Sequence, residues 1–157
     1  MPYQNPVSTF NKAAKDFRDY RQPLDALVAC KALQEALPQL SDPAQKTRMI
    51  NTFTEALTET IGSIKTQRSE TAIGKYTALS VRMFNLLSDV SPESVSAGSP
   101  LAALIDQEAH ATARASMRST SKSIGGALGR SADTLALMRR VAQPESPFKP
   151  QGHRFKI

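Results

Sequence analysis

Few side chains in this sequence are of the types that carry out covalent catalysis. Cys30 is the single cysteine, His110 and His153 are the two histidines, and all three lie far apart along the chain. A cysteine nucleophile needs a histidine base beside it, whereas Cys30 has the apolar neighbours of a buried thiol. We therefore predict an inert, buried cysteine and a protein that is not an enzyme.

Two short patterns resemble ligand sites, but neither has the residues at the positions that such a site requires. Residues 124–131, IGGALGRS, lack the first glycine of a phosphate-binding loop, place Arg130 where that loop has lysine, and follow no strand. Asp106, Glu108 and His110 alternate at two-residue steps, which puts Glu108 on the opposite side of a helix from the other two. A metal ion needs more ligands than that pair. We expect no metal, no cofactor and no small-molecule substrate.

Positive charge is the chemistry that the sequence does offer. The last 47 residues hold nine Lys and Arg against two Asp and Glu, about +7, whereas the preceding 110 residues are about −1. This asymmetry indicates an acidic partner, which is nucleic acid, an anionic membrane or the acidic face of a protein.

The basic residues are regularly spaced in one segment. Arg114, Arg118 and Lys122 recur at four-residue steps, so a single helix from Ala109 to Ser131 would carry them on one ridge, with Arg130 near its continuation. Phosphates or carboxylates would neutralise that ridge, although such a run is also usual on a solvated helix face. With the last helix and the tail, the candidate partner-binding residues are Arg114, Arg118, Lys122, Arg130, Arg139, Arg140, Phe148, Arg154, Phe155 and Lys156.

The elements that position these residues are predicted to be helices. Between prolines and glycines the apolar residues recur every three or four positions, with almost no alternating strand pattern. We predict an all-α, compact bundle of about five to six helices in one domain, residues 1–143, with its main loop at 91–100. A proline-rich basic tail, residues 144–157, is expected to be disordered or extended and is either a docking peptide or simply a free end.

Helix boundaries follow from capping residues and prolines. Starts are predicted at Ser8, Pro23, Asp42–Pro43, Ser99–Pro100 and Ser131. The polar residues 66–71 are expected to divide 43–90 into two helices, the competing interpretation being one unbroken helix. Phe10 and Phe17 are expected on the buried face of the first helix, and Leu24, Val28 and Leu33 on the apolar stripe of the second.

Small side chains dominate residues 109–131. They allow two helix backbones to approach closely, so this face is an internal contact, a docking seam for a partner or second copy, or a solvated surface. Gly125 to Gly129 is the expected site of fraying or a hinge.

Together these features predict a non-enzymatic helical interaction module, such as an adaptor, regulator, inhibitor or bacterial-type effector. It would bind an acidic protein face, or a second copy, through the small-residue helix and the basic C-terminal region. The alternative is a nucleic-acid-binding accessory protein, although the region has few aromatic residues for stacking. No apolar stretch approaches the roughly 18 residues of a membrane span, and the start lacks an apolar signal region. We expect a cytoplasmic protein, or one exported without a cleavable signal peptide.

Overall fold

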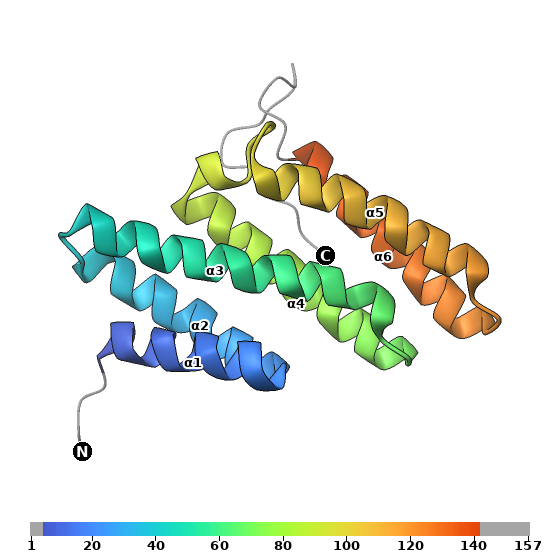
Figure 1. Cartoon of the computed structure of the whole chain (residues 1–157), viewed down its shortest axis with the longest axis horizontal. Coiled ribbons are helices and arrows are strands. Elements are labelled where there is room, and N and C mark those ends of the chain that lie inside the picture. Colours follow the sequence, from blue (N-terminus) through green and yellow to red (C-terminus); the bar gives the residue numbers. More distant parts are fainter. Residues whose placement is uncertain (1–4, 142–157) are drawn as a thin grey trace. The chain divides into compact units, whose positions relative to one another are not determined.

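The computed structural model describes residues 5–141, and within that range it contains six α-helices and no strand (Figure 1). The predicted all-α fold is confirmed. The basic tail predicted at 144–157 lies outside the described residues. The helices are α1 (Pro6–Tyr20), α2 (Pro23–Ala36), α3 (Pro43–Ser63), α4 (Glu70–Val90), α5 (Pro100–Arg118) and α6 (Lys122–Val141), with short 3-10 turns η1 (Leu37–Gln39), η2 (Ile64–Thr66) and η3 (Pro92–Ser94).

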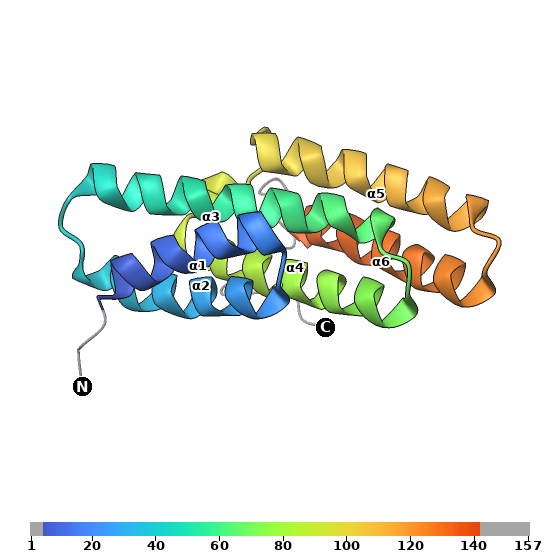
Figure 2. The same cartoon turned by 60° about the horizontal axis from the view of Figure 1, so that its bottom comes forward.

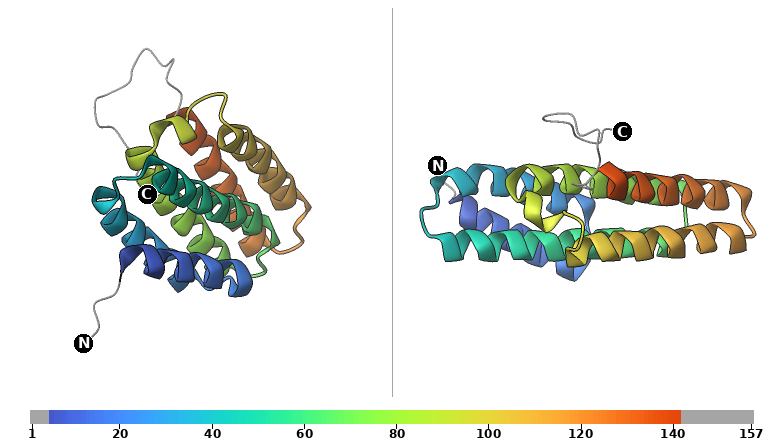
Figure 3. Two further views of the ribbon diagram at one scale, coloured as in Figure 1. Left: turned by 60° about the vertical axis from the view of Figure 1, so that its left-hand side comes forward. Right: turned by 90° about the horizontal axis from the view of Figure 1, so that it is seen from above.

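The helices group into two units, one up to Ala56 and one from Leu57 onward. In the first unit α1 and α2 form an antiparallel hairpin, in which they lie side by side (Figure 2). In the second unit α5 and α6 form another such hairpin, and α6 also packs on α4 (Figure 3). The single domain predicted for residues 1–143 stays a prediction.

The α1–α2 hairpin begins earlier than its sequence suggests. Asn5 rather than Ser8 caps α1, because its Oδ1 accepts a hydrogen bond of 2.9 Å from the Val7 N–H and Pro6 occupies the first helical position. At the other end, Arg21 adopts a left-handed conformation (φ 57°) that ends the helix. The predicted start of α2 at Pro23 is confirmed.

The predicted apolar stripe of α2 is wrong in part. Leu33 is buried, but the side chains of Leu24 and Val28 are 69% and 38% exposed. The buried positions of α2 are mostly small: Ala26, Ala29, Cys30, Ala32, Leu33 and Ala36. The expectation for α1 is confirmed, since Phe10 and Phe17 are buried.

The boundaries of α3, α4 and α5 largely follow the sequence signals. Asp42 Oδ1 accepts a 3.0 Å hydrogen bond from the Ala44 N–H at the start of α3, and Ser99 Oγ accepts one of 3.1 Å from Ala102 at the start of α5. The division of residues 43–90 is confirmed, because η2 and the cap at Ser69 separate α3 from α4.

The single helix predicted from Ala109 to Ser131 is wrong. α5 ends at Arg118, a turn covers residues 119–121, and α6 begins at Lys122. Ser131 does not cap a helix but is buried within α6, where its Oγ lies 2.6 Å from Thr77 Oγ1 of α4. Gly125 to Gly129, the predicted hinge, is regular helix. The glycines instead permit close contact with α5.

Two adjacent glycines test this contact. A Cβ built at Gly125 lies 3.2 Å from the Ser116 carbonyl oxygen, whereas one at Gly126 meets only the end of the Arg130 side chain, at 3.5 Å. We expect Gly126→Ala to raise the free energy of unfolding by about 0.5–1 kcal/mol through helix propensity. Gly125→Ala should lack that gain and fall at least about 1 kcal/mol below Gly126→Ala, as measured by urea denaturation. Equal stabilities of the two variants would contradict the close packing of α5 on α6.

Candidate interaction surface

An exposed group of one apolar and three basic side chains lies around the turn between α5 and α6. It consists of Arg114, Met117, Arg118 and Lys122, which we call the hairpin-end surface. Met117 is 86% exposed, the largest exposed fraction among the large apolar residues of the described chain. None of the three cations forms an ion pair with another described residue. This surface therefore combines an exposed apolar side chain with positive charge that no described residue neutralises.

Serine side chains make the turn that presents this surface. Ser119 leaves the helical conformation (ψ 134°), and its Oγ donates to the Ser121 carbonyl at 3.1 Å and accepts from the Ser121 N–H at 3.3 Å. Ser121 Oγ in turn accepts a 3.3 Å hydrogen bond from the Ile124 N–H. The Ser119 hydroxyl competes with the helix for backbone groups where α5 ends, and the Ser121 hydroxyl caps the start of α6. Arg118 and Lys122 consequently lie on either side of the turn.

The small residues below this surface form an internal seam. Ser116 Oγ donates a 2.6 Å hydrogen bond to the Gly125 carbonyl, and a Cβ built at Gly129 would lie 3.2 Å from the same hydroxyl. The two helices thus pack backbone to backbone, as small side chains allow. Of the alternatives for the small residues, the internal contact holds at Ser116, Gly125 and Gly129.

The helix dipoles affect the two basic residues at the turn in opposite ways. Arg118 lies in the last turn of α5, at the negative end of that helix dipole, where a cation is stabilised. Lys122 is the first residue of α6, at the positive end, where a cation is destabilised. Residues 109–131 contain no acidic side chain that would offset this cost.

Of the other predicted cations within the described residues, two form ion pairs and one does not. Arg130 Nη2 lies 3.3 Å from Glu70 Oε2, and Arg139 Nε lies 3.1 Å from Asp106 Oδ2. Arg140 is exposed, with no ion pair to a described residue. The predicted ridge is therefore wrong as one face of a single helix, because the turn at 119–121 separates Lys122 from Arg114 and Arg118, and Arg130 pairs with Glu70 of α4. The remaining predicted residues lie outside the described residues: Phe148, Arg154, Phe155 and Lys156.

Met117 is the one member of this surface that the sequence-based prediction missed. It stands between Arg114 and Arg118 in a segment almost free of large apolar residues. A large apolar residue three positions after an arginine lies beside it on the same face of a helix, as Met117 does with Arg114. That spacing could have identified Met117 as part of the surface from the sequence alone.

The candidate catalytic and metal-binding residues remain apart from this surface. Cys30 is buried, at 2% exposure, as predicted. Glu108 is buried while Asp106 and His110 are exposed, which confirms that Glu108 faces away from the other two. Among residues 5–141, no group of three His, Cys, Asp or Glu is arranged to hold a metal ion.

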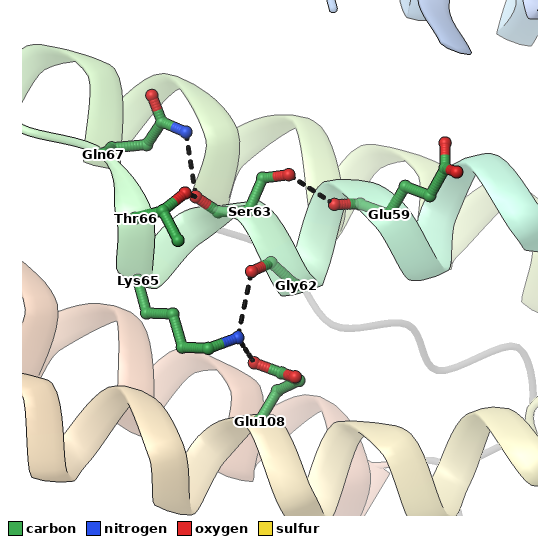
Figure 4. A network of polar contacts seen from close by, with 7 residues as sticks. All are labelled: Glu59, Gly62, Ser63, Lys65, Thr66, Gln67 and Glu108. Atoms are coloured by element: carbon green, nitrogen blue, oxygen red, sulfur yellow. Dashed lines mark hydrogen bonds and ion pairs between the residues drawn. The ribbon is translucent and has the colours of Figure 1, made fainter.

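Glu108 instead forms a partly buried ion pair with Lys65 in the second unit (Figure 4). Lys65 Nζ donates to Glu108 Oε1 at 2.6 Å and to the Gly62 carbonyl at 3.0 Å, which joins the end of α3 and η2 to α5. The Glu108 side chain is only 11% exposed. Gly62 leaves room for this carboxylate, since a Cβ built there would lie 4.0 Å from Glu108 Oε2. This pair holds α5 against η2.

Comparison of the chain with models of protein families, with curated proteins and with solved structures found no match. None of the helices within residues 5–141 combines the length and the apolar character needed to cross a membrane. Function is therefore inferred from the residues themselves.

Removing Lys65 should destabilise the fold. We expect Lys65→Met to lower the free energy of unfolding by about 1–3 kcal/mol, because the Glu108 carboxylate would stay buried without its partner. The matched control is Lys15→Met, which removes the exposed ion pair between Lys15 and Asp19 and should cost less than about 0.5 kcal/mol. Urea denaturation of both variants checks this, and equal losses would contradict a structural role for the buried pair.

Proposed function

We propose that this chain is a non-enzymatic interaction module that captures the acidic face of a protein partner through its hairpin-end surface. The observation that carries the proposal is the 86% exposure of Met117 near three cations that form no ion pair with any residue of 5–141. A partner that covered Met117 and offered carboxylates would satisfy both features at once.

Met117 has the properties of an anchor for a protein partner. A methionine side chain is flexible and polarisable, so it adapts to apolar depressions of different shape. Removing such an apolar side chain from water supplies affinity, whereas the surrounding charges mainly speed the encounter and orient it. Arg114, Arg118 and Lys122 are placed for that second task.

Nucleic acid is the alternative partner. The three unpaired cations would suit phosphate groups, and each phosphate contact would add to the salt dependence of binding. Phosphates, however, give Met117 no apolar contact, and residues 109–141 contain no Phe, Tyr or Trp on which bases could stack. We therefore favour the protein partner.

Lys122→Glu should change stability and partner binding in opposite directions. The substitution places an anion at the positive end of the α6 dipole, so we expect it to raise the free energy of unfolding by about 0.5 kcal/mol. The same change should weaken capture of an acidic partner. The measurement is urea denaturation combined with affinity capture from a lysate, quantified by mass spectrometry. A variant that is both more stable and fully competent in capture would contradict the proposal.

Met117→Ala distinguishes the two partner classes. We expect it to reduce capture of the protein partner about fivefold or more, while binding to a mixed DNA and RNA pool at low salt changes little. The control is Arg48→Glu, a charge reversal at an exposed position of α3 outside this surface, which should leave capture unchanged. Strong nucleic-acid binding that is lost in Arg114→Glu but not in Met117→Ala would favour the alternative.

A further inference from the structure

A second surface lies on the α1–α2 hairpin. It is hollow and negatively charged, whereas the hairpin-end surface is positively charged. A groove of about 550 Å³ runs between the two helices. Its lining residues are Asn5, Ser8, Thr9, Lys12, Ala13, Asp16, Asp25 and Val28. Ala13 and Val28 give the groove an apolar part, and Leu24, one turn before Val28 on α2, extends the exposed apolar surface.

The charge of this groove is negative. Lys12 Nζ lies 2.8 Å from Asp16 Oδ2, so these two charges offset each other. Asp25 has no ion pair with a described residue. The pKa of Lys12 is raised, chiefly by its hydrogen bond to Asp16 and the charge of that carboxylate, with a further contribution from Asp25. Asp25 therefore already interacts with the charge of Lys12. The lining holds two carboxylates and one ammonium, so the groove keeps a net negative charge.

The two surfaces differ in form and in charge. The hairpin-end surface offers an exposed methionine and three cations, whereas the groove offers a hollow with an apolar part and the carboxylate of Asp25, and neither these cations nor Asp25 forms an ion pair with a described residue. We propose that the hairpin-end surface of one copy docks into the α1–α2 groove of a second copy. Met117 then contacts Ala13 and Val28, and the basic residues face Asp25.

This inference rests on the proposed function, because it names a second copy of the chain as a partner of the same surface. The contact joins two different surfaces, so a bound pair still has one free surface of each kind. Such an assembly grows beyond a dimer unless it closes into a ring. An acidic protein partner would compete for the hairpin-end surface and so limit the growth.

The test is a mixing experiment with two full-length variants. The hairpin-end variant carries Met117→Gln and Arg118→Gln, and the groove variant carries Asp25→Lys and Val28→Lys, so the two altered surfaces do not attract each other. All four positions are at least partly exposed, and circular dichroism checks that both variants keep their helices. Molar mass is measured by sedimentation velocity and light scattering on nuclease-treated protein at about 50 mM salt.

We expect the wild-type mass to rise with concentration beyond twice that of the monomer, and to fall back to the monomer in high salt. Each variant alone should stay monomeric. An equimolar mixture should double the mass of the monomer and stop there, because the intact hairpin end of one variant fits the intact groove of the other.

Three results would overturn the inference. They are a wild-type monomer at every concentration, association that persists in either variant alone, and a mixture that does not form the heterodimer. In each case the proposed function stands if Met117→Ala still reduces capture of another protein from lysate, and it fails separately if capture is unchanged.

Discussion

The close approach of α5 and α6 is the constraint on which the hairpin-end surface depends. Gly125 has no room for a side chain against the Ser116 carbonyl, and the Ser116 hydroxyl is bonded to the Gly125 carbonyl at 2.6 Å. These contacts fix how each helix is rotated about its axis. With Ser116 turned toward α6, Met117 is left exposed to solvent.

The basic residues of the second unit serve two different purposes. Arg130 and Arg139 reach carboxylates on α4 and α5, and such partly exposed pairs contribute up to about 1 kcal/mol each. Lys122 has no such partner and lies at the unfavourable end of a helix dipole. A cation placed against the preference of its own helix is more readily explained by something that it binds than by the stability of the chain.

Helix ends that depend on nearby residues could be predicted from the sequence, whereas contacts between residues far apart in the chain could not. Asp42 and Ser99 cap their helices as predicted, because a cap bonds to residues two or three positions away. Ser131 has the same signal, but its hydroxyl bonds Thr77, 54 residues earlier, and no local pattern reports that partner. The predicted cations at Arg114, Arg118 and Lys122 do lie on the surface, but the ridge fails because serines end the helix at 119.

Both hairpins bury small residues where their helices meet and leave a few larger apolar side chains exposed. The buried residues of α2 include four alanines, while Leu24 and Val28 are exposed, and α5 packs on α6 through Ser116 and glycines while Met117 is exposed. The other large apolar side chains of these helices, such as Phe17 and Leu135, are buried in the usual way. Exposed side chains of that size gain free energy only when another surface covers them. Val28 on one hairpin and Met117 on the other are such side chains, and the proposed contact between copies would cover both.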